Sequence, residues 1–308
     1  MSCAHFLLRA GIQVEMFERA DVPGGLLAYG IPGFKLSKQI VERRFALLEQ
    51  AGLQLHLHAE VGHDRTIDQL LAEHDAVFLG LGATNGKRAG IDKEDHQHVF
   101  LAMEFLTNVQ RRIADRAWME RFGVLGKRVV VVGGGDTAMD CVRTAVREGA
   151  ETVTCLYRRD DRNMPGSGKE YLNAVEEGVA FQFLSAPQRV VVDDCGEVSG
   201  IDVIRTRLGE SDESGRQRVE EVTGTEFCIP CDVVIMALGF DMEGFPGLRD
   251  SGVELGKWGE VMIDPATGRS SNPKVFAGGD CFRGADLAVT AAADGKRAAL
   301  AIMKQLLG

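Results

Sequence analysis

The sequence predicts an α/β protein in which one domain is inserted into another. The chain has 308 residues, which at roughly 150 residues per domain indicates about two domains. It holds 37 glycines and only 8 prolines, a balance that favours many tight turns between strands and helices. Residues 75–82 and 232–239 repeat one pattern, an acidic residue followed by an apolar strand and a terminal glycine. This repeat indicates that the long segment between the two strands is an inserted domain.

The first third of the chain alternates between helical and extended patterns. Helices are predicted over residues 2–10, 39–51, 67–73 and 101–122, and strands over 12–18, 53–58 and 75–83. Gly11 and Gly52 end the first two helices, because glycine readily takes the left-handed conformation that closes a helix. Residues 75–83 are apolar almost throughout, as expected of a parallel strand that is buried on both faces.

The rest of the chain continues this alternation around a glycine-rich centre. Strands are predicted over residues 128–132, 152–157 and 232–238, a strand and glycine-rich turn over 274–280, and helices over 137–148, 169–177 and 286–307. Hairpin-like strands follow residue 178, with residues 209–224 as the exposed loop. We therefore expect one domain from residues 1–122 and 241–308, and an inserted domain from residues 123–240.

Composition and charge exclude several classes of protein. The formal net charge of −10 removes the usual electrostatic attraction for nucleic acid or an anionic membrane. No apolar run approaches the roughly 18 residues of a membrane-spanning helix, and the first residues lack the layout of a signal peptide. Seven scattered cysteines are typical of reduced thiols in a cytoplasmic protein rather than of a disulfide framework.

The inserted domain carries a dinucleotide-binding fingerprint. Gly133, Gly135 and Ala138 fit the pattern G-x-G-x-x-G/A between a continuous valine strand and a helix. The first glycine allows a tight turn, and the second lets the backbone approach a pyrophosphate at the helix N-terminus. The alternative is a strand-to-helix turn with a purely structural role.

The residues after the next strand predict which nicotinamide cofactor binds. A site for NAD has an acidic residue at this position, to bind the ribose 2′-hydroxyl, whereas an arginine accommodates the 2′-phosphate of NADP. This chain has Arg158 and Arg159 there, and the guanidinium group is a planar donor suited to phosphate. The pattern favours NADPH over NADH. The alternative is a pair of solvated surface arginines.

The N-terminal domain has an acidic residue, not an arginine, after the corresponding strand. Glu18 ends a predicted strand, where an acid binds ribose in a nucleotide without a 2′-phosphate, such as FAD. Gly24 and Gly25 follow and could let the backbone approach a cofactor. Counting back about 20 residues from Glu18 places the expected glycine-rich loop at or before Met1. Either Glu18 is an ordinary surface residue, or the chain begins within the first helix of a nucleotide-binding domain.

These motifs together resemble a known family. The chain is similar, from Met1 to Gly308, to the small (beta) subunits of NADPH-dependent glutamate synthase and their paralogues among flavoprotein reductases with two dinucleotide-binding domains. The resemblance rests on residues 24–27 (GGLL), 29–36 (YGIPGFKL), 75–80 (DAVFLG), 133–144 (GGGDTAMDCVRT), 157–160 (YRRD), 163–167 (NMPGS), 276–280 (FAGGD) and 284–287 (GADL). It implies two Rossmann-like domains, with the NADPH domain inserted in the FAD domain.

The resemblance also implies the roles of individual residues. Around FAD it places Glu18, Gly24, Gly25, Leu26, Gly279, Asp280, Ala288, Val289 and Thr290. Around NADPH it places Gly133, Gly135, Asp136, Thr137, Arg158 and Arg159. Gly82 and Gly239 are also expected to bind a cofactor. The start of the last helix, at residues 288–290, would face the flavin, where a helix N-terminus stabilises negative charge. No catalytic side chain or metal ligand is expected, because the cofactors carry the chemistry.

The implied activity is transfer of a hydride from NADPH to FAD. Electrons would then pass to iron–sulfur centres and to a large subunit that makes glutamate from glutamine and 2-oxoglutarate. Family members carry, ahead of this region, a cysteine-rich iron–sulfur domain and then the first strand and glycine-rich loop of the FAD domain. Both are absent from this sequence, which also has Ser167, Gly168 and Lys169 where a more arginine-rich stretch is expected. Its cysteines form no C-x-x-C-x-x-C run, so iron–sulfur ligation is expected elsewhere.

Other activities remain open at this stage. Cys228 and Cys231 form a C-x-x-C pair, which could be a redox dithiol as in thioredoxin reductases, a pair of incidental thiols or, least of all, a metal site. A paralogous reductase that serves another electron acceptor has the same motifs. A third alternative is a fragment that binds NADPH and holds no flavin.

Overall fold

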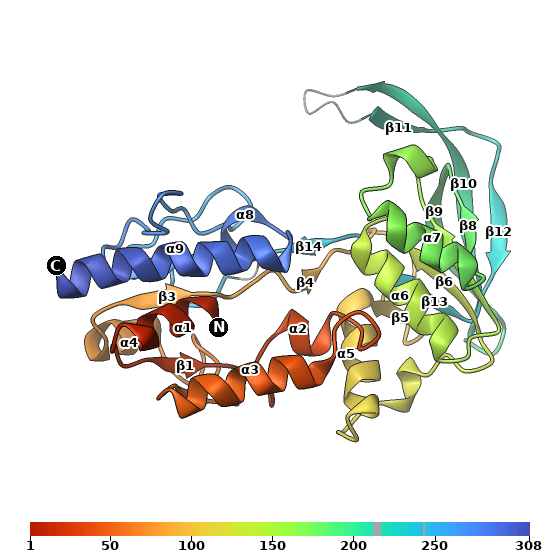
Figure 1. The fold of residues 1–308 in the computed structure, drawn as a ribbon. Coiled ribbons are helices and arrows are strands. Elements are labelled where there is room, and N and C mark those ends of the chain that lie inside the picture. Colours follow the sequence, from red (N-terminus) through yellow and green to blue (C-terminus); the bar gives the residue numbers. More distant parts are fainter. Residues whose placement is uncertain (212–216, 243) are drawn as a thin grey trace. The chain divides into compact units, whose positions relative to one another are not determined.

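The chain folds into two compact units. The computed structural model describes residues 1–211, 217–242 and 244–308. Unit 1 comprises Met1–Ala28, Gly33–Asn85 and Phe240–Gly308, and unit 2 comprises Tyr29–Pro32 and Gly86–Gly239 (Figure 1). These limits differ from the expected ones, because residues 86–122 belong to unit 2 rather than to the N-terminal domain. The physical reason is that Phe100, Phe105 and Leu106 are buried in the core of unit 2. No helix of the described residues is long and apolar enough to cross a membrane.

Unit 1 contains two short parallel sheets and the helices around them. Its strands are β1 (Glu15–Phe17), β2 (Gln54–His56), β3 (Val77–Leu79) and β15 (Val275–Ala277), together with the pair β4 (Asn85–Gly86) and β14 (Phe240–Asp241). Its helices are α1 (Ser2–Arg9), α2 (Leu26–Tyr29), α3 (Lys38–Gln50), α4 (Ile67–Glu73), α8 (Asp280–Arg283) and α9 (Ala288–Leu307). β1 pairs with β2, and β3 pairs with β15, both in parallel.

The strands of unit 1 are shorter than the apolar patterns that predicted them. Strands were expected over residues 12–18 and 75–83, and the structure has three-residue strands in both places. Among the described residues β1 pairs only with β2, and β3 only with β15. The flanking apolar residues Val14 and Ala76 pack against the core of unit 1 without extending either ladder.

The short helix α1, the long helix α9 and β15 pack together in one core cluster of unit 1. Phe276 of β15 is fully buried in a cluster with Leu7 of α1 and Ala298 of α9. α1 and α9 approach closely at Gly295, where a Cβ atom would lie 3.0 Å from the backbone nitrogen of Cys3. The hydroxyl of Ser2 also donates to the carbonyl oxygen of Ala292 at 2.6 Å. The N-terminus of α1 is therefore fixed against the first half of α9.

Unit 2 is built on a five-stranded parallel sheet. Its strand order is β5 (Val99–Leu101), β13 (Val233–Met236), β6 (Arg128–Val132), β7 (Thr152–Leu156) and β8 (Ala180–Gln182). Its main helices are α5 (Ala102–Ile113), α6 (Asp136–Arg147) and α7 (Gly168–Glu176), with short 3-10 turns at Glu120–Phe122 and Asp161–Asn163. The predicted strand at 128–132 is observed with the same limits, and its four valines are almost completely buried.

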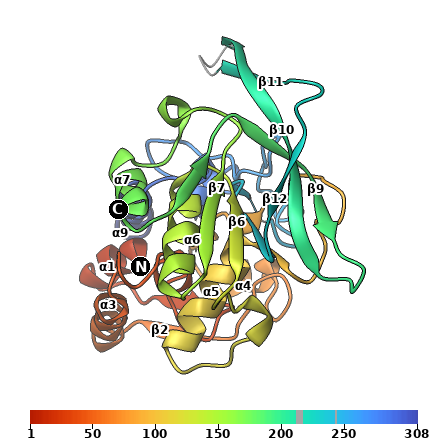
Figure 2. The same cartoon turned by 90° about the vertical axis from the view of Figure 1, so that its right-hand side faces the viewer.

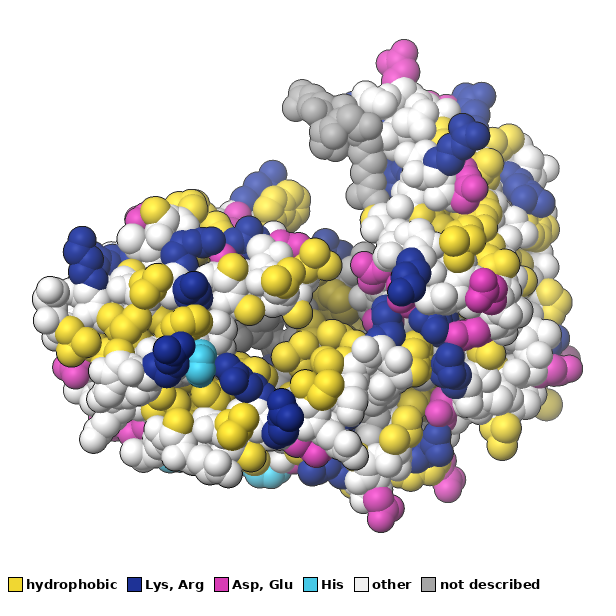
Figure 3. Space-filling model, in the orientation of Figure 1, with side chains coloured by type: hydrophobic (Ala, Val, Ile, Leu, Met, Phe, Trp, Pro, Cys, Tyr) yellow, Lys and Arg dark blue, Asp and Glu magenta, His cyan; other side chains and the backbone are white. Residues whose placement is uncertain are grey.

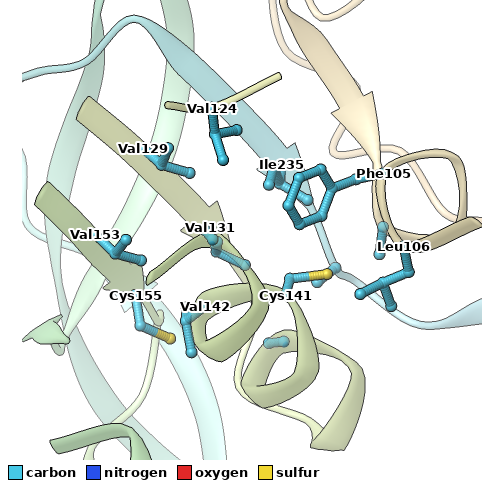
Figure 4. Packing of buried hydrophobic residues seen from close by; sticks show 14 of the residues in the cluster. Phe105, Leu106, Val124, Val129, Val131, Cys141, Val142, Val153, Cys155 and Ile235 are labelled. Atoms are coloured by element: carbon cyan, nitrogen blue, oxygen red, sulfur yellow. The ribbon is translucent and has the colours of Figure 1, made fainter. Parts of the chain in front are cut away.

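Each face of this sheet has its own cover, as the alternating valines of β6 show. Val129 and Val131 pack with Phe105 of α5 and Val142 of α6 (Figure 4). Val130 and Val132 point the other way and pack against the antiparallel sheet of unit 2. Figure 2 shows α6 on one side of β6 and β7, and β9, β10 and β12 on the other. This arrangement explains why β6 is apolar without interruption.

The antiparallel sheet contains β9 (Ser185–Val192), β10 (Val198–Ser211), β11 (Gln217–Glu221) and β12 (Phe227–Pro230). β10 is its central strand and pairs with the other three. The prediction of an exposed loop over residues 209–224 was wrong for residues 209–211 and 217–221, which lie in strands, while residues 212–216 lie outside the described residues. The hairpin is polar on its exposed surface, and Arg207 pairs with Glu220 across it at 2.8 Å, so hydrophobic alternation did not reveal it.

The helix predicted over residues 101–122 is interrupted. α5 ends at Ile113, and Asp115 takes a positive φ of 53° that a continuing helix cannot contain. The side chain of Asn108 then holds the returning chain, because its Nδ2 donates to the carbonyl oxygen of Met119 at 3.0 Å and its Oδ1 accepts from the amide of Met119 at 2.7 Å. Apolar spacing alone could not indicate this reversal.

Candidate dinucleotide-binding sites

The first candidate site lies where the strand order of unit 2 reverses. β6 is followed along the chain by β7 on one side, while β13 lies on its other side. In open parallel sheets, ligands bind at the carboxyl ends of the strands at such a switch point. The residues directly after β6 are Gly133, Gly134 and Gly135, here called the glycine turn, and α6 begins after them at Asp136.

Each glycine of this turn faces a different environment. At Gly133, whose φ is +147°, a Cβ atom would lie 2.2 Å from the carbonyl oxygen of Ala237. At Gly134 a Cβ atom would lie 2.6 Å from the ring of Tyr157. At Gly135 a Cβ atom would meet no atom within 4 Å. The first two glycines therefore allow close packing, whereas the third opens onto free space at the N-terminus of α6.

A second segment closes over the glycine turn. Residues 163–167, here called the strap, are fixed by the amide of Gly166, which donates to the carbonyl oxygen of Gly134 at 3.1 Å. The amide of Ser167 donates to Oδ1 of Asp136 at 2.8 Å. The hydroxyl of Tyr157 donates to the carbonyl oxygen of Asn163 at 2.8 Å. The carboxylate of Asp136, expected to line the site, thus holds the strap in place. Thr137 lies beside it, half-buried in the first turn of α6.

The two arginines after β7 have different surroundings. Arg158 is exposed, next to the ring of Tyr157 that packs on Gly134. Arg159 is buried, and its Nε donates to the carbonyl oxygen of Gln217 on β11 at 3.1 Å. The sequence predicted the same role for both arginines. In the structure Arg159 ties the end of β7 to the hairpin, and Arg158 is the more accessible cation.

An ion-pair network centred on the buried Arg143 joins α6 to α7. Arg143 of α6 contacts Glu170 at 2.6 Å and Glu177 at 2.7 Å, and Arg147 contacts Glu177 at 2.7 Å. The hydrogen bonds that Arg143 donates to Glu177 raise the pKa of Arg143 above its ordinary value. Burial works against ionisation of Glu177, but Arg143 and Arg147 outweigh it and lower the pKa of Glu177. This network was not found from the sequence, where its members read as ordinary surface charges of two helices.

The second candidate site lies at the carboxyl ends of the unit 1 strands. Glu18 follows β1, and its Oε1 accepts from the amide of Ala20 at 2.9 Å, which shapes the turn. Beside it, Nη2 of Arg19 donates to Oγ1 of Thr84 at 3.0 Å, in the segment after β3. Gly82, with a φ of +76° and no atom within 4 Å of an added Cβ, belongs to that same segment. The structure thus brings the ends of β1 and β3 together.

Gly24, Gly25 and Leu26 lead into the short helix α2. Gly24 has a φ of +120°, and a Cβ atom there would lie 3.1 Å from Val41 of α3. Gly25, with a φ of +52°, faces open space instead. This pair repeats the division of roles seen in the glycine turn of unit 2, with one glycine packed against the protein and one open. Gly239, at the end of unit 2, is also open and has a φ of +95°.

Residues 278–280 form the third part of the unit 1 site and are here called the 278–280 turn. The amide of Gly278 donates to the carbonyl oxygen of Leu79 at 3.3 Å, which joins the turn to the end of β3. Burial raises the pKa of Asp280 above its ordinary value. The amide of Gly279 donates to Oδ2 of Asp294 on α9 at 3.0 Å. Asp294 was missed from the sequence, where it is one acidic residue in an alanine-rich helix.

The start of α9 presents apolar side chains to solvent. Leu287 and Val289 are 61% and 71% exposed, and Ala288 is exposed with them, while Thr290 is half-buried. Among the described residues no side chain caps this helix. The first-turn amides of a helix have no partner within it, so they are available to a ligand. Such exposed apolar residues beside a helix N-terminus can contact a planar, anionic group.

The C-x-x-C pair does not have the geometry of a redox dithiol. Cys228 lies exposed on β12, whereas Cys231 follows the strand and is only 1% exposed. Burial raises the pKa of Cys228 and raises the pKa of Cys231 to about 12. A reactive cysteine needs a lowered pKa, because the thiolate is the nucleophile. Among the described residues no cluster of His, Cys, Asp or Glu could hold a metal ion.

Comparison with known proteins identifies the family. The model of the pyridine nucleotide-disulphide oxidoreductase family matches residues 1–295. The chain belongs to this family. The α/β fold class predicted from the sequence is confirmed.

The chain is similar to several longer relatives. It is 46% identical to the glutamate synthase [NADPH] small chain of Escherichia coli and also to that of Halomonas elongata, covering 99% of this chain and 66% of each relative. It is 39% identical to the NADP(+)-dependent formate dehydrogenase subunit beta of Moorella thermoacetica, covering 99% of this chain and 42% of that protein. The resemblance inferred from the motifs is confirmed. The chain spans less than two thirds of the length of these relatives.

Two solved structures show the same fold. FprA of Mycobacterium tuberculosis in complex with NADPH aligns with a TM-score of 0.80 at 18% identity, covering 99% of this chain and 82% of that one. The thioredoxin reductase of T. acidophilum aligns with a TM-score of 0.75 at 21% identity, covering 100% of this chain and 95% of that one. At these identities the likeness is one of fold.

Proposed function

We propose that the protein is an NADPH-dependent flavoprotein reductase of the glutamate synthase small-subunit type. In this proposal unit 2 binds NADPH, unit 1 binds FAD, and the electrons leave through iron–sulfur centres to a large subunit that makes glutamate. A cytoplasmic location belongs to the same proposal. The observation that carries it is the glycine turn, which is closed at Gly133 and Gly134 and open at Gly135, with Arg158 at the end of the adjacent strand.

Unit 2 has the features that recognition of NADPH requires. The open side of Gly135 lets a pyrophosphate approach the backbone and the N-terminus of α6. Arg158 supplies a guanidinium group for the 2′-phosphate, and Arg159 holds the end of β7 through Gln217. The strap and Asp136 fix the shape of the turn before the ligand arrives. This preorganisation lowers the entropy lost on binding.

Unit 1 has features that fit FAD. Glu18 is placed at the end of β1 for a ribose hydroxyl, and Gly25 and Gly82 leave space that any other residue would fill. The 278–280 turn and the exposed start of α9 supply polar and apolar surface for the rest of the cofactor. When bound, FAD accepts a hydride and stores two electrons. The protein itself binds and orients the two nucleotides and excludes water from them.

The most specific part of the proposal is the identity of the electron acceptor. Two relatives at 46% identity are named as glutamate synthase small chains, which supports a large subunit that makes glutamate as the partner. A relative at 39% identity is named as a formate dehydrogenase subunit, so the same reductase unit serves more than one assembly. A disulfide substrate is disfavoured, because Cys231 is buried and neither Cys228 nor Cys231 has the lowered pKa of a redox pair.

Reconstitution tests the cofactor part of the proposal. The purified protein is titrated with FAD and, separately, with NADPH and NADH, and binding is followed by flavin fluorescence and by nicotinamide fluorescence. We expect saturable binding of FAD and of NADPH, with NADPH bound at least tenfold more tightly than NADH. Binding of NADPH without FAD would contradict the proposal and support a nucleotide-binding fragment instead.

The acceptor is tested by adding the large subunit of glutamate synthase with its iron–sulfur centres. We expect glutamate to form from glutamine and 2-oxoglutarate at the expense of NADPH. Reduction of an artificial dye without glutamate formation would favour a paralogue that serves another acceptor.

A further inference from the structure

Asp294 is a buried carboxylate that neither the sequence motifs nor the proposed function assign. It lies in α9 and is 2% exposed, one turn before Ala298 in the core of unit 1. Burying a charged group is costly unless hydrogen bonds satisfy it. The partners of Asp294 therefore indicate why this residue is acidic.

Four hydrogen bonds reach this carboxylate. Oδ2 accepts from the amide of Gly279 at 3.0 Å and from Nε of Arg283 at 3.0 Å. Oδ1 accepts from Nη2 of Arg283 at 2.7 Å and from Nη1 of Arg297 at 2.9 Å. The carboxylate thus joins α9 to the 278–280 turn and to the end of α8. Burial acts to raise the pKa of Asp294, but these donors outweigh it and lower the pKa, so the group is ionised at neutral pH.

The 278–280 turn is pressed against α9 at this point. A Cβ atom at Gly278 would lie 2.7 Å from Cβ of Asp294, and one at Gly279 would lie 3.2 Å from Cβ of Ala291. Gly279 has a φ of +76°, a conformation that favours glycine. Gly279 directly precedes α8 and Arg283 ends it, so Asp294 contacts one residue at each end of this short helix.

We propose that Asp294 is a positioning residue for the cofactor of unit 1: it holds the 278–280 turn, and with it Asp280, in the orientation that receives the flavin nucleotide. This inference rests on the proposed function. Asp294 itself does not touch the cofactor. The amide of Gly279 already donates to Asp294, so it is not available to donate to a phosphate of the cofactor. Gly279 contributes to the site through the backbone conformation of the turn instead.

The test compares Asp294→Asn with a matched control. Asparagine keeps the volume and one acceptor oxygen but loses the charge and the forked contact with Arg283. Asp232→Asn is the control, because Asp232 accepts from the amide, Nε and Nη2 of Arg128 at 2.8, 3.1 and 2.6 Å, nearly the same set of donors, in unit 2. The readouts are the Kd for FAD, the visible spectrum of bound flavin, the Kd for NADPH and the thermal midpoint.

We expect Asp294→Asn to raise the Kd for FAD at least tenfold and to change the spectrum of bound flavin, with the Kd for NADPH unchanged. The control should leave the Kd for FAD within about twofold of the wild type. Equal FAD affinity in wild type and Asp294→Asn would overturn the inference alone. Absence of FAD binding by the wild type would overturn the proposed function and the inference with it.

Hydrogen exchange in the wild type keeps the inference testable if Asp294→Asn fails to fold. The amide of Gly279 is expected to exchange slowly before FAD is added, because its hydrogen bond to Asp294 already exists. Fast exchange that slows only when FAD binds would show that the cofactor, and not Asp294, orders the turn. That result would overturn the inference.

Discussion

Gly133 lies so close to Ala237 that a Cβ atom at Gly133 would be 2.2 Å from the carbonyl oxygen of Ala237. Two neighbouring strands, β6 and β13, end here side by side. The contact fixes the point at which the chain turns from β6 into the glycine turn and α6. Gly135, two residues later, has open space where its Cβ atom would be, so packing falls to Gly133 and the space for a ligand lies at Gly135. Figure 3 shows acidic and basic side chains interspersed over the visible face, so no patch of one charge marks a nucleotide site on that face.

The first prediction compares alanine at these two glycines. Gly133→Ala forces backbone atoms apart and should lower the free energy of unfolding by about 2–3 kcal/mol. Gly135→Ala, where φ is −89° and the space is open, should leave stability within about 0.5 kcal/mol of the wild type but raise the Kd for NADPH at least tenfold. Urea unfolding and nicotinamide fluorescence measure the two effects. Equal stability of the two variants would contradict the assignment of the roles.

The second prediction separates the two arginines after β7. Arg158→Gln should reduce the preference for NADPH over NADH by about 10- to 100-fold in kcat/KM, because it removes an accessible cation without emptying a core site. Arg159→Gln should mainly lower the thermal midpoint, since Arg159 is buried and bound to Gln217. Steady-state kinetics with both nucleotides and calorimetry make the comparison. A loss of coenzyme preference in Arg159→Gln alone would reverse the assignment.

The third prediction concerns the thiols. Cys228→Ser and Cys231→Ser, made together, should leave NADPH-dependent dye reduction within about twofold of the wild type, because neither residue has the lowered pKa of a nucleophile. A thiol reagent added to the native protein should label Cys195 and Cys228, the exposed members of the seven, before the others. Activity that disappears in the double variant would support disulfide reduction.

The fourth prediction is a loss of stability in acid. The pKa of Asp232, of Asp294 and of Glu177 is lower in the folded protein than in the unfolded chain, where ordinary values near 4 apply. The unfolded state then binds more protons, so these groups contribute stability above about pH 5 that is lost as the pH falls through their folded values. Thermal midpoints measured from pH 7 to pH 3 should decline below about pH 4. Asp232→Asn should make the decline shallower.

Local patterns predicted the helices, the buried strands and the glycine turn. The helix Ile67–Glu73 and the strand Arg128–Val132 were found with the same limits, because periodicity and burial agree there. The limits of the strands in unit 1 and of β10 and β11 were not predicted correctly. These limits depend on backbone pairing between segments that are distant in sequence or polar. The glycines of the glycine turn could be predicted, because their role depends on the strand and the helix directly beside them in the sequence.

The groups that hold the candidate sites in shape could not be predicted in the same way. Asp294 and Gly279 are 15 residues apart, and Arg143 meets Glu170 and Glu177 from another helix, so their pairing appears only in the fold. The one sequence signal that points to Asp294 is an acidic residue within an alanine-rich helix. Likewise, nothing in the dipeptide at 158–159 indicates that one arginine is exposed and the other is bound to β11.

The most direct test of the account is an anaerobic titration of the FAD-loaded protein with NADPH. The account predicts that the visible absorption of oxidised flavin is bleached by one equivalent of NADPH, that NADH bleaches it far more slowly, and that Arg158→Gln narrows this difference. Flavin that stays oxidised in excess NADPH, in a protein that binds both nucleotides, would contradict the claim that this chain is a reductase.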